Sequence, residues 1–412
     1  MSLIKPFRAL RPVPGRAAEV LAPPYDVLSS AEARARANGK PWSFLHVSKA
    51  EIDLPPSTDP YAPEVYAKAA ANLQRMIAAG VLVRDEKPCL YVYRLTWRGH
   101  TETGLAAVAA LDAYAANRIR KHEFTTPAKE DDRVRQIEAV NAQTGPVMLA
   151  YPAAPAIDAM LARAAAGSPA VDVTADDGVC HQLWVIDNTA TIASLTRAVD
   201  ALPALYIADG HHRSAAALRV AQARGEGGGG THQSFLAVLF PQDQMTILDY
   251  NRVLRDLNGR NPAALLAEIR KRYAVETSEE PVRPAAADEV GMFLAGRWYR
   301  LTLTLEAAAA SEQPNDPVSR LPVTLLARNI VEPIFGVTDP RRDKRIDFVG
   351  GGRGLGELER LVASGEAAVA FALYPTQMRD LMAVADAGAI MPPKSTWFEP
   401  KLADGMVSHM LD

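Results

Sequence analysis

The sequence predicts an α+β protein with two domains. Segments of strand-like alternation and segments with apolar residues at helical spacing are mixed along the chain of 412 residues. With 48% hydrophobic residues the chain can bury a substantial core, and its length suits two domains better than one. From about Asn261 strands and helices alternate more regularly. We therefore expect an N-terminal α+β domain over residues 1–260 and a two-layer α+β domain over residues 261–412.

Individual elements follow from spacing and capping residues. Apolar spacing predicts a helix over Tyr61–Ala79, and alternation predicts a strand over Cys89–Trp97. Thr126 and Pro127 suit the N-cap and first position of a helix that runs to about Ala142. The other expected segments are a strand over Leu105–Leu111, a connecting region over Ala153–Asn188, a helix over Thr191–Ala201, strands over Phe235–Phe240 and Met245–Asn251, a helix over Ala263–Tyr273, a hairpin over Met292–Leu305, a helix over Val318–Phe335, a strand over Ile346–Val349, a helix over Leu355–Ser364, a strand over Ala368–Tyr374 and a helix over Thr376–Ala387.

Charge and composition exclude several classes of function. Lys and Arg number 45 against 48 for Asp and Glu, so there is no overall cationic field to hold a polyanion, and any phosphate recognition must be local. No apolar run approaches the roughly 20 residues needed to cross a bilayer, and charges and prolines interrupt the N-terminal stretch. Cys89 and Cys180 lack metal-type spacing. We expect a cytoplasmic protein that binds neither nucleic acid nor membrane.

The segment Leu205–Arg213, LYIADGHHR, is typical of a strand that turns directly into a helix. β-Branched and aromatic residues precede Asp209, Gly210 permits a tight turn, and the stretch from Ser214 favours a helix. Unpaired backbone N–H groups in a first helical turn attract anions, and Arg213 can add a bidentate phosphate contact. The alternative interpretation makes Asp209 an ordinary N-cap. The predicted phosphate-binding residues are Gly210, His211, Arg213 and Ser214, with His212 as a further donor and Asp209 as a metal ligand or orienting group.

This segment resembles the G-x-H-R element of the ParB/sulfiredoxin superfamily, in which a strand, a turn and a helix bind nucleotide phosphates. Gly210, His212 and Arg213 match the element, while Asp209 and His211 fill its variable positions. The resemblance implies a mixed-sheet ParB/sulfiredoxin-like core and a nucleotide site similar to that of free serine kinases. Sulfiredoxin chemistry needs a cysteine where this sequence has His211, which disfavours that activity.

Four segments together resemble an uncharacterised bacterial and archaeal protein family, and the resemblance covers essentially the whole chain. The family is known chiefly as a domain of unknown function, so the parallel with free serine kinases is an analogy that depends on the phosphate element. The segments are APPYDVLS at Ala22–Ser29, KHEFT at Lys121–Thr125, ADGHHR at Ala208–Arg213 and MPPKSTWFEPK at Met391–Lys401.

Two of these segments offer acidic groups. Glu123 could take a proton from an attacking hydroxyl while His122 or Lys121 stabilises charge, as phosphoryl transfer to an alcohol requires. The alternative is a solvated charged turn. Asp26 follows two prolines that fix an extended entry, and it is either a metal ligand or base or the cap of a helix near Ser30.

The last segment is a loop entered through two prolines. Lys394, Ser395 and Thr396 could cradle a phosphate or a carboxylate, although the glycine frame of a P-loop is missing. The alternative is a segment anchored by its aromatic residues. The nearby run Phe348–Glu357 lacks the glycine spacing of a dinucleotide fingerprint and is interpreted as a flexible turn.

The leading hypothesis is a nucleotide-dependent phosphotransferase, a kinase acting on a small hydroxylated metabolite, with free serine as the first candidate by resemblance. ATP or ADP would be the nucleotide and Mg²⁺ the metal, held by Asp209 and Asp26. The expected catalytic residues are Glu123, His122, Asp209 and His212.

Two alternatives belong to other classes. One is a metal-dependent phosphoesterase whose metal is held by Asp209, His211, His212 and His122. The other is a non-enzymatic nucleotide-binding regulatory protein. No helix-turn-helix pattern supports DNA binding, and the oligomeric state is left open.

Overall fold

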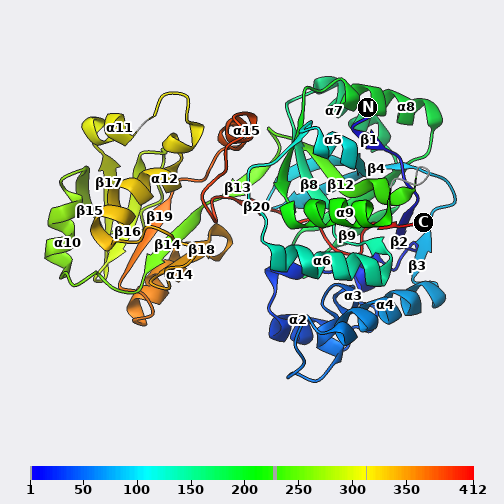
Figure 1. Cartoon of the computed structure of the whole chain (residues 1–412), viewed down its shortest axis with the longest axis horizontal. Helices are drawn as coiled ribbons and strands as arrows, with labels where there is room; N and C mark the ends of the chain where they lie inside the picture. The colour runs from blue at the N-terminus through cyan, green and yellow to red at the C-terminus, as the bar shows by residue number, and fades with distance from the viewer. Residues whose placement is uncertain (1, 226–229, 312) are drawn as a thin grey trace. The chain divides into compact units, whose positions relative to one another are not determined.

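The computed structural model describes residues 2–225, 230–311 and 313–412, which form two compact units (Figure 1). One unit comprises Met1–Met245 and Pro400–Asp412, and the other comprises Thr246–Glu399. Each unit contains helices and strands, which confirms the α+β prediction. The sequence places the boundary near residue 260, whereas the division in the structure falls after Met245 and the chain returns to the first unit at Pro400.

A nine-stranded mixed sheet forms the centre of the first unit. Its strands are β1 (Ile4–Lys5), β4 (Leu90–Trp97), β5 (His100–Ala110), β6 (Ile119–Arg120), β8 (Val147–Tyr151), β9 (Val171–Thr174), β10 (Cys180–Ile186), β11 (Leu205–Asp209) and β12 (Ser234–Pro241). They lie in the order β6-β11-β8-β12-β5-β4-β10-β9, with β1 paired to β5. The β6–β11 and β8–β12 pairs are parallel and the other pairs are antiparallel.

A smaller sheet and nine helices complete the described part of this unit. The small sheet has the order β3-β2-β21-β7, with β2 (Ala9–Pro12), β3 (Leu82–Arg84), β7 (Ala142–Gln143) and β21 (Ser408–Met410). The helices are α1 (Ala17–Val20), α2 (Ser30–Ala37), α3 (Leu45–Ser48), α4 (Pro63–Ala78), α5 (Leu111–Ala115), α6 (Pro127–Val140), α7 (Pro155–Ala164), α8 (Thr189–Asp200) and α9 (His211–Arg224), with 3-10 turns η1 (Tyr25–Val27), η2 (Ala50–Asp53) and η3 (Thr231–Gln233).

Helix α9 is held between the large sheet and α6. Ala217 and Ala221 face the core that alternate residues of the sheet form with α7 and α8. On its other side Ala216 and Val220 pack against Ile137 of α6, and Figure 1 shows the two helices side by side. Small alanine side chains permit this close approach. The loop that precedes α6 is therefore held near the start of α9.

The second unit is built on a six-stranded antiparallel sheet in the order β15-β17-β16-β19-β14-β18. Its strands are β14 (Tyr250–Leu254), β15 (Tyr273–Ser278), β16 (Glu289–Leu294), β17 (Arg297–Leu303), β18 (Ile346–Gly350) and β19 (Val369–Leu373), and β13 (Thr246–Leu248) pairs separately with β20 (Trp397–Glu399). The helices are α10 (Pro262–Ile269), α11 (Leu305–Ser311), α12 (Pro322–Leu326), α13 (Glu332–Phe335), α14 (Leu355–Ala363) and α15 (Met378–Asp386), with 3-10 turns η4 (Pro317–Arg320) and η6 (Gly351–Arg353) and a π turn, η5 (Ala327–Val331).

Several expected elements are confirmed and three differ. The strand expected over Met245–Asn251 is divided between β13, which pairs with β20, and β14, which pairs with β18 and β19. The helix expected over Tyr61–Ala79 is α4. The continuous helix expected over Val318–Phe335 is broken, because Pro322 holds Leu321 in an extended conformation between η4 and α12. The connecting region expected over Ala153–Asn188 contains α7, β9 and β10. No described helix has the length and hydropathy that a membrane span requires.

Candidate functional site

The turn between β11 and α9 has the predicted strand–turn–helix form. Asp209 ends the strand, Gly210 lies in the left-handed region with a φ of 102°, and α9 begins at His211. The first N–H groups of a helix have no partners within the helix and carry partial positive charge. Because a Cβ at Gly210 would lie 3.0 Å from Nε of Arg213, glycine also lets this guanidinium lie directly against the turn.

We expect Gly210→Ala to destabilise the fold by about 2 kcal/mol, since it combines a left-handed conformation with this close contact. Gly80→Ala is a matched control, because Gly80 has a φ of 65° and no heavy atom would lie within 4 Å of its Cβ. Urea denaturation of both variants measures the difference. Equal losses of stability would show that the contact with Arg213 contributes nothing.

The KHEFT segment meets the DGHHR segment at this turn. Strand β6 runs parallel to β11, so the residues that follow the two strands reach the same edge of the sheet. The rings of His122 and His211 meet edge to face with centroids 4.5 Å apart. Oε2 of Glu123 lies 3.7 Å from Nδ1 of His211. Two segments that lie far apart in the sequence therefore form one cluster.

His122 and His211 are buried, His212 is partly exposed, and the pKa of each is lowered, which favours the neutral form near pH 7. Burial lowers the pKa of His122 to about 4. Burial, together with the neighbouring His122, lowers the pKa of His211 well below its usual value. Burial also lowers the pKa of His212, whose Nε2 accepts the backbone N–H of Thr126 at 3.1 Å. At neutral pH these rings offer lone pairs and N–H donors rather than positive charge.

Asp209 is held between two cations. Its Oδ2 lies 3.2 Å from the Arg213 guanidinium and 3.4 Å from Nζ of Lys401. Burial alone would raise the pKa of this carboxyl, but Lys401 and Arg213 outweigh burial and lower it well below its usual range. Arg213 also donates to the backbone carbonyl of Pro146. Asp209 therefore stays ionised, and the two cations are positioned beside the start of α9.

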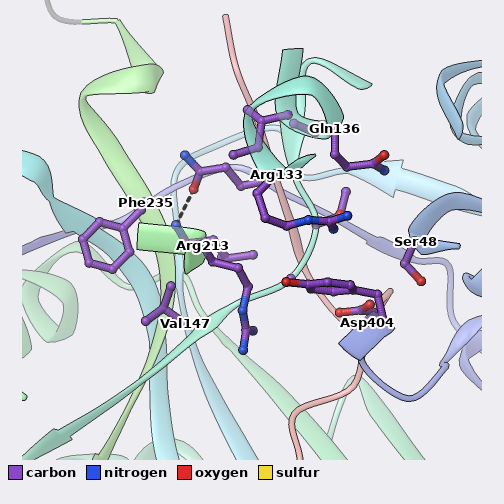
Figure 2. Close-up of a pocket in the computed structure, with 14 residues that line it drawn as sticks. Ser48, Arg133, Gln136, Val147, Arg213, Phe235 and Asp404 are labelled. Atoms are coloured by element: carbon purple, nitrogen blue, oxygen red, sulfur yellow. Dashed lines mark hydrogen bonds between the residues drawn. The ribbon is translucent and has the colours of Figure 1, made fainter. Parts of the chain in front are cut away.

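A small pocket of about 30 Å³ lies beside Arg213, enough for about two water molecules. Figure 2 shows Arg133, Arg213 and Asp404 reaching into it. The Arg133 guanidinium lies 3.8 Å from the centroid of the Tyr25 ring. Two largely buried guanidinium groups, with side chains 13% and 11% exposed, and the buried carboxyl of Asp404 thus share one cavity.

Asp404 has an unusual environment. It is 2% exposed, and its Oδ1 has no hydrogen-bond partner. Burial, with a contribution from Asp26, raises its pKa to about 7, although Arg213 and Arg133 oppose the shift. A carboxyl that titrates near neutral pH is a candidate for coupling protonation to ligand binding.

The raised pKa predicts how stability depends on pH. Between the unfolded pKa of about 4 and the folded pKa of about 7, the folded state binds the extra proton, so this group's contribution to stability is complete at low pH and is lost as pH rises. We expect Asp404→Asn to remove this loss and to be more stable than the unaltered protein at about pH 8, by about 3 kcal/mol. Urea denaturation between about pH 5 and pH 8 measures it, and parallel curves for the two proteins would contradict the assignment.

Other predicted site residues lie in the first unit. Asp26, in η1, is close enough to contribute to the pKa shifts of Arg213, His212 and Asp404. Ser214 is fully buried, and its hydroxyl donates to the backbone carbonyl of His211 at 3.0 Å. The APPYD segment thus joins the cluster, whereas the Ser214 hydroxyl is already engaged within α9.

Lys394, Ser395 and Thr396 belong to the second unit. Nζ of Lys394 lies 5.8 Å from the centroid of the Tyr250 ring. The Ser395 hydroxyl donates to the carbonyl of Pro392 at 2.6 Å. The part of these residues in the phosphate site stays a prediction.

Sequence reasoning missed four residues at the site. Tyr25 and Lys401 lie inside two of the four family-like segments, but the residues predicted to act there include Asp26 and Lys394 instead. Asp404 and Arg133 lie outside every segment and carried no signal. The missed residues are Tyr25, Arg133, Lys401 and Asp404.

The fold defines the chain as an α+β protein with a mixed sheet and a separate antiparallel sheet. Residues 4–324 match the family described as "Protein of unknown function (DUF1015)". The match spans more than half of the chain, and the chain belongs to this family. Comparison with functionally curated proteins found no match.

Solved structures give distant matches. A free serine kinase in complex with AMP has 13% sequence identity and a TM-score of 0.34, over 71% of this chain and 86% of that one. C-terminally truncated SbnI from Staphylococcus aureus has 14% identity and a TM-score of 0.37, over 73% and 86%. A conserved hypothetical protein from Pyrococcus furiosus has 12% identity and a TM-score of 0.33, over 73% and 93%. Scores of this size assign no function, so the proposals below depend on this chain's own residues.

Proposed function

We propose that this protein is a nucleotide-dependent phosphotransferase that acts on a small hydroxylated metabolite. One observation carries the proposal: Glu123, a candidate base, and the N-terminus of α9, a candidate phosphate site, meet at the same sheet edge on either side of His211. Phosphoryl transfer needs these two functions close together, because catalysis is mainly positioning and charge stabilisation. The proposed core is of ParB/sulfiredoxin type.

The nucleotide phosphates would bind the first turn of α9. The backbone N–H groups after Gly210 supply donors, and Arg213 and Lys401 supply positive charge within 3.4 Å of Asp209. Because Asp209 already pairs with both cations, an incoming phosphate can share them without requiring new charges to be buried. His212, whose Nε2 accepts the backbone N–H of Thr126, keeps an N–H donor at Nδ1.

Glu123 is the proposed general base. Its side chain is 49% exposed, so it can reach a substrate hydroxyl, and His211 beside it is buried and neutral. A carboxylate hydrogen-bonded to the acceptor hydroxyl would take its proton as the hydroxyl oxygen attacks the terminal phosphorus. His122 would fix the position of His211.

The remaining assignments are parts of the same proposal. Asp209 and Asp26 would hold Mg²⁺, which when bound neutralises phosphate charge. ATP or ADP would be the nucleotide, and free serine is the first acceptor to examine because the DGHHR segment resembles the element of free serine kinases.

Phosphorus NMR tests this proposal directly. The full chain is incubated with Mg²⁺, with ATP or ADP, and with a panel of hydroxylated metabolites that includes serine. A new phosphate-ester signal that requires both nucleotide and acceptor supports transfer. Release of inorganic phosphate alone favours the phosphoesterase alternative, and nucleotide binding without any product favours the regulatory alternative.

A further inference from the structure

The side chains of His122, Glu123 and His211 gather into one group at the edge of the sheet. A ligand atom from each lies within 4.8 Å of the others. Two imidazoles and a carboxylate form a common protein site for zinc and similar ions. Proximity alone does not define such a site, so the state of each ligand atom matters.

His122 presents a nitrogen with no partner. The residue is 2% exposed, and its Nδ1 is buried without a hydrogen bond. The ring also bonds the backbone carbonyl of Ile207, and this bond must come from Nε2 because Nδ1 has none. A metal-binding histidine commonly donates its second N–H to a backbone carbonyl, which fixes the tautomer and aims the free lone pair. A buried lone pair without a donor is costly unless a ligand uses it.

His211 and Glu123 supply the other two candidate ligand atoms, and these atoms face each other. Nδ1 of His211 lies 3.7 Å from Oε2 of Glu123, close to the ~3.4 Å that separates two ligand atoms around a tetrahedral zinc ion. Nε2 of His211 accepts the backbone N–H of His122 at 3.4 Å. Metal binding through Nδ1 moves the ring proton to Nε2 and gives up this long hydrogen bond. The half-exposed Glu123 can close the remaining distance.

We propose that His122, His211 and Glu123 bind a divalent transition-metal ion of the zinc type, through Nδ1 of each histidine and a carboxylate oxygen. Three protein ligands leave a fourth position open to water or to an oxygen of a bound molecule. The negative charge of Asp209 lies close enough to act on both histidines, which also favours a cation. Glu123 provides the path from solvent.

Occupancy of this site has a consequence for phosphotransfer, and this part of the inference rests on the proposed function. A carboxylate that ligates a metal no longer accepts a proton from a substrate hydroxyl. Zinc is therefore an inhibitor of the Mg²⁺-dependent reaction, and it acts by withdrawing Glu123.

Calorimetric titration of the chelator-treated full chain with zinc chloride tests the site independently of activity. We expect saturable binding of one equivalent, weakened ~10-fold or more by Glu123→Gln or His211→Ala. Because the Glu123 side chain is half exposed, its substitution should leave the fold intact even where His211→Ala does not. His100→Gln is the matched control, since the exposed His100 lies 3.5 Å from the buried carboxylate of Glu102, and both belong to β5 rather than to the proposed site. Weak binding that Glu123→Gln leaves unchanged overturns the proposal.

A second measurement separates failure of this site from failure of the proposed function. Zinc added to an assay with excess Mg²⁺ should stop transfer at concentrations that match the calorimetric affinity. Transfer that proceeds in the presence of saturating zinc overturns the inhibitory role. If no transfer occurs under any condition, the proposed function fails, while the calorimetric result still decides the metal site.

Discussion

Arg213→Met should abolish measurable nucleotide binding and lower the free energy of unfolding by about 3 kcal/mol. The Arg213 side chain is 11% exposed, and it pairs at 3.2 Å with Asp209, whose side chain is 31% exposed. Burial alone would lower the pKa of Arg213, but the nearby Asp209 and Asp26 outweigh burial and raise this pKa above its usual value. Removing one partner of this partly buried pair leaves the other without full compensation, which accounts for the loss of stability. Loss of the guanidinium also removes the proposed phosphate contact.

Isothermal titration with ADP and ATP, together with urea denaturation, measures both effects. Arg219→Met is the matched control, because Arg219 lies on the same helix, is 41% exposed and pairs with Asp131 at 2.7 Å. It should change stability by less than about 1 kcal/mol and leave binding intact. Arg213→Lys should recover part of the stability but little of the binding, since an ammonium lacks the planar fork. Full nucleotide affinity in Arg213→Met would remove Arg213 from the phosphate site.

Glu123→Gln should lower kcat for phosphotransfer by about 10³-fold with little change in nucleotide affinity. Loss of a general base typically costs 10²- to 10⁴-fold. The amide keeps the size of the side chain and removes only its ability to accept the proton. Because Glu123 is half exposed and lies beside a neutral His211, its substitution should not disturb folding.

The measurement compares kcat and nucleotide Kd for the variant and the unaltered chain. Glu138→Gln serves as the control, because Glu138 is similarly exposed and pairs with Arg224 in an ion pair at 3.2 Å on the α6–α9 face. Turnover retained in Glu123→Gln would exclude this carboxylate as the base. Turnover lost equally in Glu138→Gln would point to a general effect on folding.

Local sequence patterns predicted much of the fold. Helix α4 follows from apolar spacing, and the β11–α9 turn follows from the change of composition on either side of Gly210. Such patterns depend on residues within a few positions of one another. The break at Pro322 was also readable, because the residue before proline avoids helical conformation, but the apolar periodicity outweighed it.

The site was only partly predictable, because several of its residues lie far apart in the sequence. Asp209 to Arg213 lie together in the sequence, so their chemistry could be inferred directly. Lys401 lies 192 residues beyond Asp209 and is brought to it only by the fold. Asp404 carries no sequence signal at all, since its role depends on burial beside Arg133 and Arg213. Pairing of β6 with β11 joins Glu123 to His211, and a two-residue strand is too short to predict from alternation.

The return of the chain at Pro400 makes assembly of the first unit strongly non-local. During translation, the entire second unit is synthesised after Arg213 and before Lys401 and Asp404. These two residues contribute to the surroundings of the Asp209–Arg213 turn. Thr246 and Glu399 are paired across β13 and β20, so the intervening unit enters and leaves at adjacent points. This pairing brings the two ends of the intervening unit together, so the entropy cost of closing the chain around it is limited. Until the chain returns, Arg213 and Asp209 lack the groups that the C-terminal segment places beside them. The proposed phosphate site is therefore complete only after both units have been synthesised.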